Sequence, residues 1–135
     1  MLRAALIFIV SLGVVGCSDN PQIVSSWATR SDKDAIIHVH IDSSDAQFIK
    51  RGQVYFSVVL NECGKTDRRF PMEPLIGGRR ATDFDFIISQ PTVEITSISP
   101  SAILDQYKTP CIMLEGGGYA GARLKSKQAR LTLPK

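Results

Sequence analysis

The chain contains few of the residues from which metal and redox sites are built. Among its 135 residues are only three cysteines and two histidines. The cysteines form no C-x-x-C pair, and a structural zinc site usually needs four cysteine or histidine ligands. We therefore expect neither a bound metal nor a cofactor.

Charge of one sign is also scarce. The 16 lysines and arginines and the 13 acidic residues leave a formal net charge of only +3. Nucleic-acid-binding domains are usually clearly basic, so we expect no nucleic acid as a partner. The sequence also lacks a G-x-S-x-G motif. We expect no enzymatic activity, although a catalytic triad can be assembled from residues that are distant in the sequence.

The chain lacks an apolar run long enough to span a membrane. Arg3 is followed by an apolar run from Ala4 to Val15 that only Ser11 and Gly13 interrupt, whereas a spanning helix needs roughly 20 apolar residues. A positive charge before a short apolar run is typical of a secretory signal peptide. The run ends in Val14-Val15-Gly16-Cys17, which resembles the lipobox of bacterial lipoproteins. An ordinary cleaved signal with an incidental cysteine is the alternative.

The lipobox resemblance implies that residues 1–16 are removed and that Cys17 carries the lipid. A diacylglycerol thioether and an acylated amine would bury enough CH₂ groups to anchor the protein permanently in a membrane. Ser18, and not aspartate, follows Cys17, which implies the outer membrane, with the domain facing the periplasm. We expect residues 17–26 to be a lipidated tether and residues 27–135 a single periplasmic domain.

Two cysteines remain once the resemblance assigns Cys17 to the lipid. The periplasm is oxidising, so Cys63 and Cys111 are predicted to form a disulfide. A reactive pair of thiols is the alternative.

Alternation of apolar and polar residues predicts a mostly β fold. Period-two patterns with many β-branched residues are typical of half-buried strands. They occur in residues 35–41, 53–61, 81–89, 92–98, 111–115 and 128–133. A single short helix is predicted from Pro100 to Gln106, capped by Ser99. These elements predict an all-β domain, an antiparallel β-sandwich or small barrel with one short helix and one disulfide.

One glycine-rich stretch has the spacing of a dinucleotide-binding fingerprint, Gly116-x-Gly118-x-x-Gly121. That fingerprint requires a helix directly after the last glycine, and here an alternating strand pattern follows. The stretch is therefore predicted to be a turn that presents Tyr119.

The two histidines, His38 and His40, lie on the same face of the strand predicted at residues 35–41. Their side chains would be roughly 7 Å apart, within reach of one metal ion. We predict a solvent-facing pair; a weak metal site completed by Asp42 is the alternative.

Two basic clusters, residues 65–69 and 79–80, flank the apolar segment 70–76. In one interpretation, the basic clusters are solvated loop ends and the apolar segment packs over the core. The other is an interface, because exposed apolar residues rimmed by arginines are typical of partner-binding surfaces. The candidate partner-binding residues are Arg68, Arg69, Phe70, Met72, Arg79, Arg80 and Tyr119.

The size, the lipid anchor and the disulfide-stapled β domain resemble the small periplasmic immunity lipoproteins that protect bacteria from type VI secretion lipase effectors. The resemblance implies a protein that binds a toxin or hydrolase and inhibits it by occluding its active site. A structural lipoprotein subunit of an envelope or secretion complex is the alternative, and a ligand- or metal-binding module is a further one.

Overall fold

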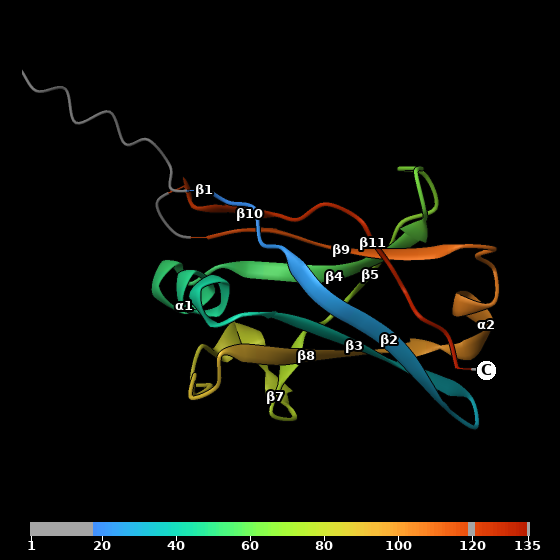
Figure 1. Cartoon of the computed structure of the whole chain (residues 1–135), viewed down its shortest axis with the longest axis horizontal. Coiled ribbons are helices and arrows are strands. Elements are labelled where there is room, and N and C mark those ends of the chain that lie inside the picture. The colour runs from blue at the N-terminus through green and yellow to red at the C-terminus, as the bar shows by residue number, and fades with distance from the viewer. Residues whose placement is uncertain (1–17, 119–120, 135) are drawn as a thin grey trace, which may run out of the picture.

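The computed structural model describes residues 18–118 and 121–134 (Figure 1). Strands dominate the chain, with one helix of three turns and two shorter helical segments. The elements are β1 (Ser18–Asp19), β2 (Ile23–Ser31), β3 (Asp34–Asp42), α1 (Ser43–Gly52), β4 (Tyr55–Glu62), β5 (Phe70–Met72), β6 (Leu75–Ile76), β7 (Arg79–Arg80), a 3₁₀ turn (Ala81–Asp83), β8 (Thr92–Pro100), α2 (Ser101–Leu104), β9 (Pro110–Gly117), β10 (Arg123–Lys125) and β11 (Ala129–Arg130).

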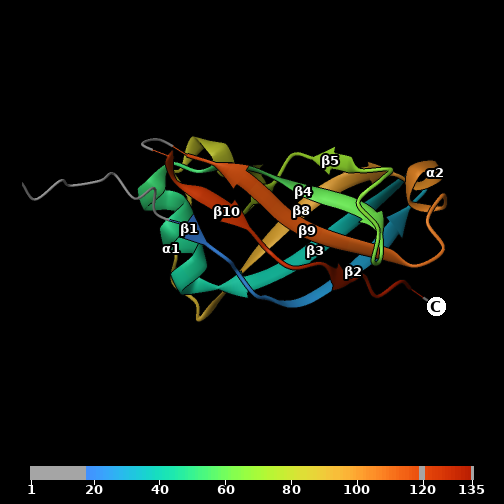
Figure 2. The ribbon, with the colours of Figure 1, turned by 90° about the horizontal axis from the view of Figure 1, so that it is seen from above.

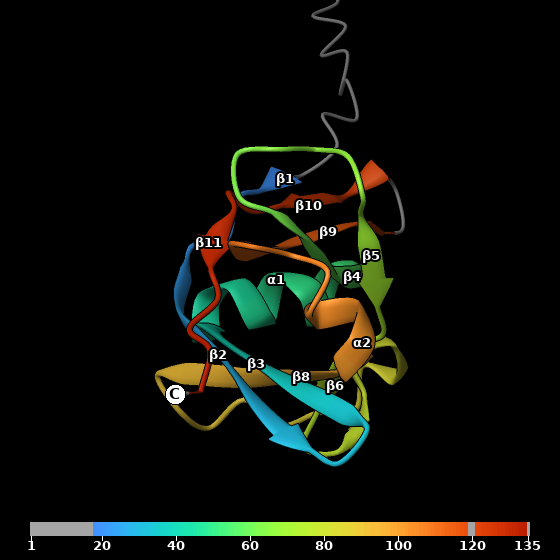
Figure 3. The same cartoon turned by 90° about the vertical axis from the view of Figure 1, so that its right-hand side faces the viewer.

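The strands form two sheets that pack face to face (Figure 3). Sheet A has the order β1-β10-β9-β4-β5, and β11 also pairs with β9. Sheet B has the order β2-β3-β8-β6-β7. All pairings between named strands are antiparallel except that of β1 with β10. The predicted all-β fold is confirmed, and of the two expected architectures, a sandwich or a small barrel, the structure is the sandwich. Seen from above, the strands of sheet A run across those of sheet B (Figure 2).

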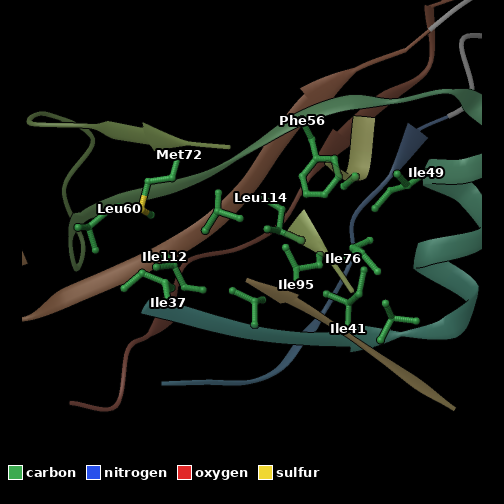
Figure 4. Close-up of a cluster of buried hydrophobic side chains, with 14 of the residues drawn as sticks. Ile37, Ile41, Ile49, Phe56, Leu60, Met72, Ile76, Ile95, Ile112 and Leu114 are labelled. Atoms are coloured by element: carbon green, nitrogen blue, oxygen red, sulfur yellow. The ribbon is translucent and has the colours of Figure 1, made fainter. Parts of the chain in front are cut away.

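The core lies between the sheets and is built from the alternating residues of the predicted strands. Every second residue of β3, beginning at Ala35, is fully buried, and β4 repeats the pattern from Phe56 to Leu60. Ile37 and Ile95 of sheet B face Ile112 and Leu114 of sheet A across the core (Figure 4). The predicted strands at residues 35–41, 53–61, 92–98 and 111–115 are confirmed within a few residues.

The main helix, α1, covers one end of the sandwich and was not predicted (Figure 1). Its first residues, Ser43 to Asp45, are typical of turns, and only Ala46 and Ile49 are buried, so the apolar stripe is short. The charges nevertheless favour a helix, because the acidic Asp45 lies in the first turn and the basic Lys50 in the last, where each interacts favourably with the helix dipole.

The helix predicted at residues 100–106 is present but shorter. In α2 only Ser101 to Leu104 are helical, and the Ser99 hydroxyl donates to the carbonyl oxygen of Pro100 and does not cap the helix.

The strand predicted at residues 81–89 is wrong. Ala81–Asp83 form a 3₁₀ turn, Phe84 has a left-handed backbone (φ 55°), and the following residues pair with no strand. The alternation still marks burial correctly, since Phe86 is buried while Asp83 and Asp85 are exposed. Apolar alternation reports which side chains meet the core, and a strand also needs a neighbour for its backbone.

The expected tether is part of the domain. Asp19 lies in β1, at the edge of sheet A, and Ile23 begins β2, the edge strand of sheet B. At the other end of the chain, residues 128–133 form only the two-residue strand β11 and a bridge from Thr132 to Trp27. Among the described residues, the hydrophobic core extends from Ala28 to Leu131.

The predicted disulfide is confirmed. Cys63 follows β4 and is bonded to Cys111 of β9, with 4.9 Å between their Cα atoms. The two strands are neighbours in sheet A, so the bond fastens one sheet and does not join the two. No helix in the described part of the chain is long and apolar enough to cross a membrane.

Candidate functional site

The outer faces of the two sheets differ. On sheet A, the outward residues Val59 and Met113 are buried, and the connection between β4 and β5 rises over that face (Figure 3). On sheet B, the outward residue Ile98 of β8 is 55% exposed, and Ile36 beside it is half-buried. Sheet B therefore presents a surface on which apolar residues reach solvent.

Aromatic and imidazole rings gather at the centre of this surface. In the strand register Trp27 of β2 lies opposite His38 of β3, and directly opposed residues of antiparallel strands share a face. The indole and the His38 ring are stacked, with centroids 4.9 Å apart and planes 4° apart. The His40 ring lies 5.0 Å from the indole and is tilted by 57°. We call the outward side chains of β2, β3 and β8 the Trp27 face: Ser25, Trp27, Thr29, Ile36, His38, His40, Glu94, Thr96 and Ile98.

Hydrogen bonds fix the His38 ring in place. Its Nδ1 lies 2.6 Å from Glu94 Oε1, and its Nε2 lies 3.0 Å from Thr29 Oγ1. The Glu94 carboxylate can only accept, so Nδ1 carries the proton, and the Nε2 of a neutral ring accepts from the Thr29 hydroxyl. Stacking on Trp27 adds a third restraint, so the centre of the Trp27 face is rigid.

The connectivity of Thr29, His38 and Glu94 is that of a hydroxyl–imidazole–carboxylate relay. Acyl transfer also needs donors aimed at the developing oxyanion, usually free backbone N–H groups. Thr29 pairs with Ile36 in the ladder of β2 and β3, and the N–H of its neighbour Ala28 points to the other side of β2, where it donates to the Thr132 carbonyl oxygen. Thr29, His38 and Glu94 therefore form an ordered polar site at the centre of the Trp27 face.

The histidines are the residues nearest to a metal-ligand set. His40 Nε2 lies 3.9 Å from the same Glu94 oxygen that bonds to His38. Glu94, and not Asp42 as the sequence suggested, is their acidic neighbour. Within residues 18–118 and 121–134, no group of three His, Cys, Asp or Glu side chains has the spacing needed to hold a metal ion.

A hollow of about 380 Å³ adjoins the Trp27 face on the far side of β8. Glu94 and Thr96 line it together with the Gly77-Gly78 turn and Ile87. The Ile87 side chain is 82% exposed, the most exposed large apolar side chain among the described residues. A recess with an exposed apolar side chain therefore lies beside the polar part of the Trp27 face, at Glu94 and Thr96.

The arginine clusters predicted from the sequence do not form a free basic patch. Three of the four candidate arginines are neutralised by nearby carboxylates: Arg69 by Glu115, Arg79 by Asp85 and Arg80 by Glu73. Arg68 is exposed and has a left-handed backbone (φ 54°), and its carbonyl oxygen accepts from the Tyr107 hydroxyl. Ion pairs of this kind favour the interpretation of these residues as solvated loop ends.

The apolar segment between the arginine clusters packs onto the core. Met72 is buried in β5 and Phe70 is partly buried against the same cluster, which favours the interpretation that this segment packs over the core. Tyr119, the last candidate, lies outside the described residues, as does Cys17.

The glycine-rich stretch is a packing element followed by a turn. Gly116 lies in β9 opposite Phe56, and a Cβ atom there would be 2.1 Å from the Tyr55 carbonyl oxygen. The Gly118 N–H donates to the Ala122 carbonyl oxygen, and Gly121 has φ +80°. β10 begins two residues after Gly121, in the place where a dinucleotide-binding site has its helix.

A second polar cluster lies where β1 meets α1. Burial is the main cause that raises the pKa of Asp45 from 3.8 to about 7, and a hydrogen bond with Asp19 and the charges of Asp19 and Asp42 add to it. Asp19 Oδ2 is buried and has no other hydrogen-bond partner among the described residues. A proton on Asp45 would give this oxygen a donor, so the pair fastens β1 to the helix.

Sequence reasoning missed Trp27, Thr29 and Glu94. Trp27 is the first residue after the segment interpreted as a tether, and Thr29 lies in the same unrecognised strand. Glu94 could have been found, because it lies in a predicted strand. The strands at residues 35–41 and 92–98 pair antiparallel, with His40 opposite Glu94. Comparison with protein-family models, with curated proteins and with solved structures found no match.

Proposed function

We propose that this chain is a lipid-anchored protein of the bacterial envelope that binds another protein through the Trp27 face and inhibits it. One observation carries the proposal: sheet B holds a tryptophan stacked on a hydrogen-bonded histidine, with exposed Ile98 beside it. Binding hot spots are enriched in tryptophan and are surrounded by residues that exclude water. The inhibitor class itself rests on the resemblance in build to immunity lipoproteins.

The rigidity of the Trp27 face supports binding. Association costs less when the side chains of the interface are already ordered. Trp27 is held by two imidazole rings, and His38 is held in turn by Thr29 and Glu94. Such a surface would block a partner's cleft without rearranging.

The position of the proposed lipid anchor also supports binding through the Trp27 face. Ser18, the residue after Cys17, already belongs to β1, so a lipid on Cys17 would hold the sandwich close to the membrane. β1 and α1 lie at one end of the long axis and α2 at the other (Figure 1). The long axis would then point away from the bilayer, with the Trp27 face on the side of the molecule.

The test is affinity capture from periplasm with residues 18–135 as bait, followed by mass spectrometry and an activity assay of the captured protein. We expect a secreted hydrolase whose activity falls on binding. Ile98→Glu should reduce capture about ten-fold or more, because it places a charge at the interface. Tyr55→Glu is the matched control, since Tyr55 is 62% exposed on the other sheet.

Capture of envelope-complex subunits, with no effect on any hydrolase, would favour the structural-subunit alternative. Equal capture by the Ile98 and Tyr55 variants would remove the Trp27 face as the site. The anchor has its own test: Cys17→Ser should release the full chain from membranes, and continued membrane fractionation would contradict lipidation.

A further inference from the structure

A groove runs along the open edge of β2. Two hollows, of about 480 and 510 Å³, share Ile23 and Ala129 in their linings and therefore lie next to each other along this edge. One wall is the chain from Asn20 to Trp27, and the other is formed by residues between Lys127 and Thr132. The groove thus lies between the edge of sheet B and the last strand of sheet A.

The strand edge in this groove is only partly covered. β2 is the end strand of sheet B, with β3 on one side. On its other side, Thr132 accepts from the Ala28 N–H and donates to the Ser26 carbonyl oxygen. Before Ser26, no strand of the described residues pairs with this edge, and Val24, at a break in the register, is 54% exposed. An edge of this kind can accept an additional extended strand.

The charge of the groove has one sign. Among the residues that the structure describes, Lys127 and Arg130 are the only charged ones that line it. Neither forms an ion pair with a carboxylate of the described residues, whereas Arg30, Arg69, Arg79 and Arg80 all do. The remaining lining is made of amides, hydroxyls and the apolar side chains of Pro21, Ile23, Val24, Trp27 and Ala129. These surroundings fit an extended segment that carries acidic and small side chains.

We propose that this groove binds an extended acidic segment of the partner protein, which adds to the edge of β2. The inference rests on the proposed function and specifies the chemistry of the partner. Trp27 lines the groove and also forms the centre of the Trp27 face, so a segment that leaves the groove would continue onto that face. Backbone bonds along β2 would supply affinity, and the two cations would select acidic side chains.

The test uses a defined probe, the capped decapeptide (Glu-Thr)₅, with ¹⁵N-labelled residues 18–135. We expect saturable shifts of the Val24, Ser25 and Arg130 amides. The double variant Lys127→Glu/Arg130→Glu should weaken binding about ten-fold or more and should gain binding to (Lys-Thr)₅, since charge complementarity is reversed. Lys33→Glu/Arg51→Glu changes the net charge equally outside the groove and should bind (Glu-Thr)₅ like the original chain.

Three results would overturn the groove proposal: no saturable shifts, shifts scattered over other basic residues, or equal loss of binding in both double variants. Vesicles that contain phosphatidylglycerol test the alternative, that the groove binds anionic lipid headgroups. If only vesicle binding depends on Lys127 and Arg130, the groove binds lipid headgroups and the peptide proposal fails. The proposed function is judged separately, by the capture experiment with Ile98→Glu, so the two can fail independently.

Discussion

The indole ring of Trp27 lies flat against the imidazole ring of His38, on the outer face of sheet B. The His38 ring cannot turn without breaking its contacts with Thr29 and Glu94. Trp27 is the only tryptophan of the chain, so its fluorescence reports directly on this contact.

Replacement of His38 should change the surroundings of the Trp27 indole ring. His38→Ala removes a stacked ring and two hydrogen bonds, so we expect a red shift of the emission and a loss of about 1 kcal/mol in the free energy of unfolding. Emission spectra and urea titrations measure both. His40→Ala is the matched control and should have a smaller effect, since His40 is tilted and has no short hydrogen bond. An equal or larger effect of His40→Ala would contradict the stacked arrangement.

Gly116 should tolerate no side chain. A Cβ atom at this position would lie 2.1 Å from the Tyr55 carbonyl oxygen and 2.5 Å from the Phe56 Cα, so the backbones of β4 and β9 would have to separate. We expect Gly116→Ala to cost about 3 kcal/mol or more of stability. At Gly117 the nearest atom is 3.5 Å away, so Gly117→Ala should be nearly neutral. Similar denaturation midpoints for the two variants would contradict the register of β4 and β9.

The disulfide should contribute strongly to stability. The cysteines are 48 residues apart, and cross-linking such a loop removes denatured-state entropy worth about 4 kcal/mol. Urea denaturation of the Cys63→Ser/Cys111→Ser double variant should show that loss, and reductant should then have no further effect. An unchanged midpoint of the original chain in reductant would contradict the prediction.

The Asp19–Asp45 pair should make stability depend on pH. Because the pKa of Asp45 is raised from 3.8 to about 7, the folded chain keeps a proton that the unfolded chain loses between these values. The free energy of unfolding should therefore fall as pH rises from about 4 to 7, and level off above. Solvent screening keeps the change on the order of 1 kcal/mol.

Asp45→Asn tests this, because an amide N–H₂ can replace the proton that Asp45 shares with Asp19. The variant should gain stability relative to the original chain at pH 8 and lose most of that advantage at pH 5. Asp67→Asn, in an exposed loop, is the control and should shift neither comparison. If Asp45→Asn changed the free energy of unfolding by the same amount at pH 5 and at pH 8, the result would contradict the shared proton.

Alternation predicted the strands that supply most of the core. Ala35, Ile37, Val39 and Ile41 are all fully buried, as their spacing indicates. The same reasoning failed at Phe84–Ser89 and at α1, for opposite reasons. The first segment has the apolar pattern without a partner strand, and α1 is held by packing at the end of the sandwich with only two buried residues.

On the Trp27 face, too, the sequence predicted the local features and missed those that depend on distant residues. His38 and His40 were placed correctly on one strand face, because period two is a local property of the chain. Their neighbours Trp27 and Glu94 come from strands 11 and 56 residues away from His38, and only the register of sheet B brings them together. The predicted arginines were neutralised by carboxylates from other elements, such as Glu115 beside Arg69.

The sequence by itself determined the strands of the core and the all-β class, because the period-two burial pattern is a local property of the chain. It also predicted the disulfide, because only two cysteines remain once the lipobox resemblance assigns Cys17 to the lipid. Tertiary structure alone decided which outer face is covered, which charges are paired, and where the open edge of β2 meets Lys127 and Arg130. Each of these depends on contacts between residues far apart in the chain, and such contacts form only once the two sheets have packed.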